Sequence, residues 1–406
     1  MIKNVASSTE AISEPRKAQK GTARYNRIKW AIFLAGISVF AQLYDFQALL
    51  GSVSDEFGKT PSQSSYLVSA STFGMAFGLL IFAFIADNFN RKNIMVFSLL
   101  SSTALTLMTP LIMNFEVLVG LNFLKGAFVS GVSAVTLAYL SEEVDKSSLG
   151  TAISFYLAGN TFGGMFGRVT TALLEGWFNW KISVLFIGVL GLVSALFFIR
   201  VFPHSRFFEP VRIPVKIKLS RMGKMLTNLN LLGIYIIAFC IMGSFVSVYN
   251  YLGFELKAPP YNLPHYLIAA IFLMYAFGII GNLVAGSLSD KYSSKRIIRL
   301  ALLAFILGIA LMFSSNLILL LLGLTIFTIA FFSAHTVAGR LVTELTEKGK
   351  SMATSLYWLF YYVGSSLIGT STGVFVNNGA WTSFFGVLLG LGVLSYFICL
   401  YSTCKL

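Results

Sequence analysis

Long apolar runs follow one another along almost the whole chain, and they restrict the fold more than any other feature of the sequence. Only 11% of the residues are charged and the mean hydropathy is +0.78, whereas a soluble domain has about 25% charged residues. Strands of a membrane barrel would be about 10 residues long with strict alternation, and the sequence lacks that pattern. We therefore predict an all-α membrane protein with twelve transmembrane helices of about 18 residues or more, near residues 28–50, 63–86, 93–113, 116–140, 148–173, 181–203, 229–253, 265–288, 296–313, 316–342, 350–375 and 381–402.

The charged residues are distributed unevenly, and this sets the expected orientation. If the N-terminus lies in the cytoplasm, the tails and cytoplasmic loops hold 25 of the 30 Lys and Arg residues and 10 of the 16 Asp and Glu residues. The external loops then hold three basic and five acidic residues, which is the positive-inside pattern of membrane proteins. We predict that both termini are cytoplasmic. Because the net charge of +14 belongs to loops and not to a folded basic domain, we expect no nucleic-acid partner.

A short hydrophilic motif occurs twice, with half of the chain between the copies. Asp87 and Asp290 are 203 residues apart in a chain of 406 residues, and each lies in a break between two apolar runs. Segments 120–130 and 323–333 match at the same offset in five of eleven positions, and segments 152–156 and 353–357 match at an offset of 201. These matches indicate two similar halves. We predict a basic cytoplasmic tail (residues 1–29), a six-helix bundle (30–203), a cytoplasmic linker (204–228) and a second six-helix bundle (229–406).

The linker contains one segment with a pattern of its own. Residues 215–226 alternate apolar and basic side chains after two prolines, Pro210 and Pro214. The pattern fits an interfacial helix on the inner leaflet, and it fits an extended tether equally well.

The loop between the second and third runs reads Ala83-Phe-Ile-Ala-Asp87-Asn-Phe-Asn-Arg91-Lys92. In this motif the chain resembles the major facilitator superfamily, whose loop typically reads Gly-x-x-x-Asp-Arg-x-Gly-Arg-Lys. The resemblance implies a cytoplasmic latch of the outward-open state, because a carboxylate near helix N-termini and a guanidinium can form a contact that breaks in the other state. Ordinary positive-inside charge is the alternative. The implied latch residues are Asp87, Arg91, Lys92, Asp290, Lys295 and Arg296.

The fifth run contains regularly spaced glycines, Gly150-x8-Gly159-x3-Gly163-Gly164-x2-Gly167-Arg168. The spacing resembles the glycine motif of the exporting, antiporter branches of the superfamily, although Gly164 replaces the family's Pro and Arg168 replaces its last Gly. Glycines on one face allow helices to approach closely and to bend. The resemblance implies helix packing at a rocking interface by Gly150, Gly159, Gly163 and Gly167, with simple close packing as the alternative.

Two ionisable residues are predicted to lie deep in the membrane, where each is costly. Asp45 lies roughly 25 Å from the cytoplasmic start of the first run, and Lys125 lies roughly 14 Å from the outer start of the fourth run. We hypothesise that Asp45 is the proton-coupling carboxylate, with a structural Asp45–Lys125 ion pair as the alternative. The Arg that proton-coupled family members carry in the fourth run is replaced by Asn122, so Lys125 is the candidate to substitute for it.

Further polar and aromatic residues complete the candidate sites. His335 is either a proton-coupling or substrate-contacting group or a satisfied structural histidine, and Arg168 either contacts the substrate or extends to the membrane interface. Tyr357 and Tyr361 have helical spacing, which fits a cavity as well as ordinary packing. Segments 139–143 and 331–335 resemble those of YnfM-like bacterial efflux proteins within the superfamily. The predicted proton-coupling residues are Asp45, Lys125 and His335, and the predicted substrate-binding residues are Gln42, Asp45, Lys125, Asn160, Arg168, His335, Tyr357 and Tyr361.

The resemblance implies a drug/proton antiporter of the kind linked to multidrug resistance, a monomer that exports a small molecule across the bacterial inner membrane by alternating access. The sequence has no Walker motif, no catalytic cluster in the apolar runs and no metal-type cysteine spacing. We therefore predict that the protein is not an enzyme and needs no metal or other cofactor. The resemblance implies that the proton gradient is its energy source. Two embedded cations against one carboxylate favour a neutral, zwitterionic or anionic substrate. An importer of a sugar or other metabolite, and a membrane protein that binds a ligand without moving it, are the alternatives.

Overall fold

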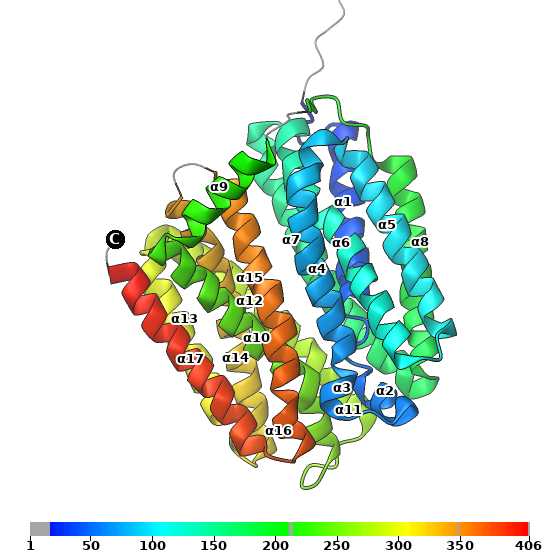
Figure 1. The fold of residues 1–406 in the computed structure, drawn as a ribbon, viewed down its shortest axis with the longest axis vertical. Coiled ribbons are helices and arrows are strands. Elements are labelled where there is room, and N and C mark those ends of the chain that lie inside the picture. The colour runs from blue at the N-terminus through cyan, green and yellow to red at the C-terminus, as the bar shows by residue number, and fades with distance from the viewer. Residues whose placement is uncertain (1–16, 211–213, 347–348, 405–406) are drawn as a thin grey trace, which may run out of the picture.

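The computed structural model describes residues 17–210, 214–346 and 349–404. This part of the chain is almost entirely helical, and its one β pairing is an isolated bridge between Ala18 and Val144. The all-α prediction is therefore confirmed. Figure 1 shows two groups of helices side by side, which we call the N half and the C half.

The N half precedes the linker helix α9 (Val215–Leu226), and the C half follows it. The helices of the N half are α1 (Ala23–Leu43), α2 (Leu50–Phe57), α3 (Pro61–Ser64), α4 (Tyr66–Ile85), α5 (Arg91–Met108), α6 (Phe115–Glu143), α7 (Lys146–Trp177) and α8 (Trp180–Val201). Those of the C half are α10 (Leu229–Lys257), α11 (His265–Ala270), α12 (Tyr275–Lys291), α13 (Ser294–Leu311), α14 (Leu317–Glu344), α15 (Lys350–Ser371), α16 (Gly373–Asn377) and α17 (Trp381–Cys404).

Each predicted apolar run overlaps a long helix in the structure, although the ends differ. Nine helical stretches of the described residues are long and apolar enough to cross a membrane. The other three runs correspond to α1, α7 and α13; α1 and α13 begin with basic residues, and α7 is rich in Gly, Ser and Thr. That all twelve cross the bilayer remains a prediction.

Asparagine side chains set the start of several long helices. Asn114, Asn179, Asn228 and Asn316 each accept a hydrogen bond from a backbone N–H in the first turn of α6, α8, α10 and α14. Such N-caps satisfy donors that the helix itself cannot pair. The caps of α6 and α14 are 202 residues apart, so the repeat extends to the way in which these helices begin.

The first helix is shorter than predicted. The apolar run was expected to continue to residue 50, but α1 ends at Leu43 and a turn over residues 44–49 precedes α2. Asp45 therefore lies in a turn and not on a helix. Helix α2, which follows this turn, is held against α8, because Lys181 and the Trp180 indole bond to the Glu56 carboxylate. Burial alone would raise the pKa of Glu56, but the bonds from Lys181 and Trp180 outweigh it and lower this pKa.

Three of the four predicted packing glycines lie against α1. A Cβ on Gly159, Gly163 or Gly167 would stand 2.5 to 2.7 Å from backbone atoms of Phe33, Ile37 or Ala41, so only glycine permits this approach. Gly150 has open space beside its Cα in this conformation, so its packing role remains a prediction. The close α1–α7 contact positions the turn that follows α1.

The two ends of the molecule differ in how the halves meet. The start of α1, helix α9 and the C-terminus of α17 lie at the same end in Figure 1, which we call the inner end because the charge pattern predicts that it faces the cytoplasm. The opposite end, with α2, α3, α11 and α16, is the outer end. In the described part of the chain, the hydrogen bonds and ion pairs between the halves gather toward the outer end.

Candidate functional site

The residues Asp45 and Lys125 form a buried ion pair. The Lys125 Nζ lies 2.8 Å from Asp45 Oδ1 and 2.7 Å from Oδ2, and the two side chains are 0% and 1% exposed. The pair joins the turn after α1 to α6, and both partners belong to the N half. Two buried charges of this kind depend on each other, because either one alone would be left uncompensated. The geometry is compatible with a coupling carboxylate and with a structural pair.

Arg168 is enclosed by protein and does not extend to the membrane interface, so the snorkelling alternative is wrong for this conformation. Its side chain is buried, with the guanidinium carbon 4.0 Å from the ring centre of Tyr44 and 4.4 Å from that of Tyr275. Its Nε donates to Gln47 Oε1, and its Nη1 donates to the carbonyl oxygen of Gly164. Tyr44 belongs to the N half and Tyr275 to the C half, so this cation–π sandwich connects the halves.

A hydrogen bond between the halves continues from Arg168. Gln47 donates from Nε2 to Asn250 Oδ1 at 2.7 Å. These two residues are 203 residues apart, which is the offset of the sequence repeat. The bond therefore joins equivalent positions of the two halves, as a contact on a two-fold axis between them would.

Two further contacts at the outer end also occupy equivalent positions. In the first, the backbone N–H of Ser62 donates to Asn377 Oδ1 at 3.0 Å. In the second, His265 Nε2 lies 2.6 Å from Glu175 Oε2. Ser62 and His265 are 203 residues apart, and Glu175 and Asn377 are 202 residues apart. We call these contacts the neutral corner and the ionisable corner.

The ionisable corner is built around one ring nitrogen. His265 Nε2 lies 2.8 Å from the carbonyl oxygen of Ala172 in addition to the Glu175 carboxylate. Because both neighbours are acceptors, Nε2 carries a hydrogen. The ring fits over Gly176, where a Cβ would stand 2.8 Å from His265 Cδ2. The sequence prediction missed His265, although an alignment of the halves places it opposite Ser62.

His335 lies in an aromatic cluster of the C half. Its Nδ1 is 2.8 Å from the Tyr357 hydroxyl, and its ring centre is 5.2 Å from that of Trp358 and 4.8 Å from that of Tyr361. The structure thus brings the predicted residues His335, Tyr357 and Tyr361 together, and it adds Trp358.

The two predicted amides, Gln42 and Asn160, lie elsewhere. Gln42 donates to Ser38 at 2.9 Å and accepts from Thr106 of α5 at 3.0 Å, so its amide is used inside the N half and does not join the other candidates. Among the residues that the structure describes, none bonds to the Asn160 Oδ1, which is buried beside Gly36 of α1. Of this pair, Asn160 alone retains an unpaired polar atom.

The first copy of the latch motif contacts the linker helix. Asp87 Oδ2 lies 2.9 Å from Lys218 Nζ of α9, and Oδ1 lies 3.6 Å from Arg91 Nη2. Arg91 also pairs with Glu142 at 3.0 Å. Lys92 is not part of this group, because its Nζ donates to the carbonyl oxygen of Phe202 at 2.5 Å, beyond the end of α8.

The second copy is paired within the C half by a different cation. Asp290 Oδ1 lies 2.5 Å from Arg340 Nη1, and Arg340 Nε lies 2.7 Å from Glu344. The predicted partners Lys295 and Arg296 are therefore replaced by Arg340. In this conformation neither motif copy bridges α4 or α12 to the other half directly, within the residues described.

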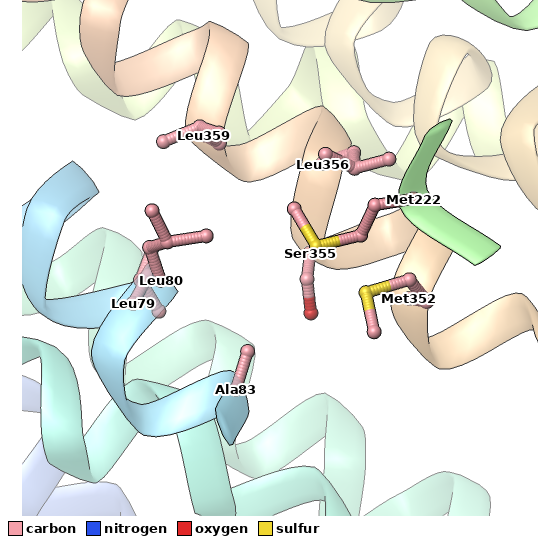
Figure 2. A pocket seen from close by; sticks show the side chains of 8 residues that line it. All are labelled: Leu79, Leu80, Ala83, Met222, Met352, Ser355, Leu356 and Leu359. Carbon is pink, nitrogen blue, oxygen red and sulfur yellow. The ribbon is translucent and has the colours of Figure 1, made fainter. Parts of the chain in front are cut away.

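A small apolar cleft lies between the halves near the inner end. Figure 2 shows side chains of α4 on one side and side chains of α15 with Met222 of α9 on the other. The lining residues are Leu79, Leu80, Ala83, Met222, Met352, Ser355, Leu356 and Leu359. The linker segment is helical, so of its two predicted forms the extended tether is wrong.

The family model of the Major Facilitator Superfamily matches residues 30–280 and 261–403. The chain belongs to the major facilitator superfamily. It is 35% identical to an uncharacterized transporter of Buchnera aphidicola from Schizaphis graminum, covering 93% of this chain and 92% of that protein. It is 33% identical to the inner membrane transport protein YnfM of Escherichia coli, covering 95% of this chain and 93% of that protein. The resemblance stated from the motifs is confirmed, and the protein is a multi-pass membrane transporter and not an enzyme.

Solved structures of the superfamily share the fold. A bacterial homologue of the lysosomal transporter Spinster superposes with a TM-score of 0.77 at 14% identity, covering 95% of this chain and 98% of that chain. The D-xylose–proton symporter superposes with a TM-score of 0.72 at 13% identity, covering 94% and 98%.

Proposed function

We propose that this transporter is a proton-coupled exporter of a small molecule, acting as a monomer in the bacterial inner membrane without a cofactor. The observation that carries the proposal is the buried Asp45–Lys125 pair. Ionisable residues inside the membrane mark proton and substrate pathways. A proton on Asp45 can take the place of the charge on Lys125, and this exchange alters the turn between α1 and α2.

The contacts between the halves support a cycle of alternating access. They gather toward the outer end, whereas the Asp87 and Asp290 groups are paired within a half or with α9. We assign this conformation to the inward-facing state. The outward-facing state requires the outer contacts to break and the latch motif to find partners across the halves.

The direction of transport is the second element of the proposal. The glycine spacing of α7 resembles that of exporting branches, and three of these glycines pack against α1. A rocking motion of α7 on α1 would act directly on Arg168, which lies one residue beyond the last of them. Helix α7, whose glycine spacing resembles that of exporters, therefore also carries the central contact between the halves.

Proteoliposomes with a pH-sensitive dye in the lumen test coupling and direction together. A drug and metabolite panel is added outside, and the lumenal pH is followed. An antiporter that takes up a compound releases protons and makes the lumen more alkaline, a symporter makes it more acidic, and a non-transporting binder leaves it unchanged. We expect alkalinisation with wild-type protein and none with Asp45→Asn.

A matched control variant is Glu116→Gln, because Glu116 belongs to the same half, pairs only with Lys59 of that half among the described residues, and its side chain is 69% exposed. We expect this variant to behave like the wild type. Lumenal alkalinisation that persists in Asp45→Asn would refute Asp45 as the coupling residue, and acidification would refute export.

A further inference from the structure

The charged side chains buried between the helices already have protein partners. Among the described residues these are Asp45 and Lys125, which pair with each other, and Arg168, which is 2% exposed, lies between two tyrosine rings and donates to Gln47 and Gly164. None of these three is placed to act as the direct counter-charge of a molecule between the halves, and a charge that leaves water without such a partner is costly. Of the neutral, zwitterionic and anionic substrates that a count of charges allows, the structure therefore favours the neutral one.

One face of α15 does not pack on α4 or α10 near its middle. Leu356 faces α4 across the apolar cleft (Figure 2), and Gly364 faces α10, where a Cβ would stand 2.1 Å from Phe239 O. At about 100° per residue, Trp358 points about 160° away from Leu356 and about 120° away from Gly364. It therefore faces neither helix.

This third face of α15 lies beside the cleft between the halves. The next residue, Leu359, lines that cleft opposite α4 of the N half. Tyr362, one turn beyond Trp358, stacks on the indole with its ring centre 5.9 Å away. Trp358 and His335 are both half-buried, so a molecule that enters between the halves can reach them.

The same two side chains each have an open hydrogen-bonding nitrogen. The Nδ1 of His335 is used by the Tyr357 hydroxyl. In the part of the chain that the structure describes, its Nε2 and the Nε1 of Trp358 have no protein partner. The Tyr357 contact orients the imidazole, so one aromatic surface and two polar atoms are presented together.

We propose that the substrate is an uncharged molecule with a planar aromatic ring and a polar group, bound by Trp358 and His335. The ring stacks on the Trp358 indole, and the polar group bonds to His335 Nε2. This inference rests on the proposed function and specifies its substrate class.

Matched probes separate charge from aromaticity. The probes are 2-naphthol (neutral), 2-naphthoate (anionic), 2-(aminomethyl)naphthalene (cationic) and decahydro-2-naphthol (neutral and saturated). Binding to the full protein in nanodiscs is measured by titration calorimetry, with subtraction of empty nanodiscs. We expect saturable binding of 2-naphthol that is about tenfold or more tighter than that of each other probe.

Variants of the two residues localise the binding. Trp358→Leu and His335→Leu should each weaken 2-naphthol binding about tenfold, whereas His335→Gln, which keeps a polar group, should retain most of it. The control is Phe186→Leu on α8, an exposed aromatic residue of the N half, which should not change the affinity. Thermal unfolding without probe shows whether each variant is folded.

The outcomes decide the proposal. Absence of saturable 2-naphthol binding overturns it, as does equal binding of a charged probe or wild-type affinity in folded Trp358→Leu and His335→Leu. If 2-naphthol binds as expected but no compound changes the lumenal pH of proteoliposomes, the coupled function fails and the site stands. If a charged compound drives proton flux, the coupled function stands and the substrate class proposed here is wrong.

Discussion

The two corners of the outer end occupy equivalent positions of the repeat but use different chemistry. The neutral corner joins a backbone N–H of Ser62 to the Asn377 amide, and the ionisable corner joins His265 to the Glu175 carboxylate. Both contacts join a helix start in one half to a helix end in the other. Duplication has preserved where the halves touch, whereas the side chains that touch have diverged, and only the second corner consists of ionisable side chains.

A third contact lies at the centre of this arrangement. Gln47 and Asn250 are equivalent residues that bond to each other, and Arg168, which has no charged equivalent in the C half, bonds to Gln47. The outer end is thus held by a symmetric hydrogen bond, reinforced on one side by a cation. Variants can separate contacts inside a half from contacts between halves.

The largest effect is expected from a contact inside one half. Lys125→Ala leaves Asp45 buried without its partner, which should lower the free energy of unfolding by about 3–5 kcal/mol. Thermal unfolding of purified protein measures this change. The double variant Asp45→Leu/Lys125→Met replaces the pair by apolar side chains and should recover most of the stability. Equal stability of the single and double variants would show that the buried charge is not the cause.

Arg168→Leu should act on the balance between conformations rather than on one half. It removes the cation–π contact with Tyr275 between the halves, together with the hydrogen bond that orients Gln47 toward Asn250, and we expect it to favour the outward-facing state by about 2 kcal/mol. Spin labels on cysteines at Val117 and Ile318, at exposed starts of α6 and α14, report the separation of the outer ends. The three native cysteines are replaced by serine.

The control for this prediction is Arg168→Lys, which keeps the charge but loses the planar fork. It should have an intermediate effect. A distribution of distances in Arg168→Leu that matches the wild type would show that Arg168 does not hold the outer end closed.

The helices could be predicted closely because the bilayer imposes their length and the loops interrupt them with charge. The end of α1 could not, because residues 44–49 contain neither Gly nor Pro. The break there depends on tertiary contacts, among them the Asp45–Lys125 pair and the bonds of Glu56 to α8. A local pattern does not record such contacts.

The candidate site could be predicted in part, because sequence position gives depth in the membrane but not direction around a helix. The depth of Asp45 and Lys125 in the membrane, read from their positions in the sequence, was enough to suggest that they pair. Depth alone could not show that Gln42 faces α5, or that Arg168 lies between two tyrosines. His265 was missed because the halves were compared where they agree, and this residue marks a position where they differ.

Removal of the neutral corner should change the outward-facing fraction less than Arg168→Leu does, and this change should not depend on pH. Asn377→Ala deprives the Ser62 N–H of its acceptor, which costs about 1 kcal/mol and should increase the outward-facing fraction about fivefold. The same spin-label distances, recorded between pH 5.5 and pH 8, measure it. An effect that varies over this range would mean that the neutral corner is coupled to a titrating group.

Removal of the ionisable corner should have the smallest effect. His265 is 44% exposed and Glu175 is 15% exposed, so water screens their contact and it contributes less than about 1 kcal/mol to the closed outer end. Glu175→Gln should therefore increase the outward-facing fraction less than Asn377→Ala does, as measured by the same spin-label distances. The double variant His265→Ser/Glu175→Asn makes this corner resemble the neutral one and should keep the outer end as closed as in the wild type. If Glu175→Gln has the larger effect instead, the two equivalent corners do not contribute to closure of the outer end in the way that their exposure indicates.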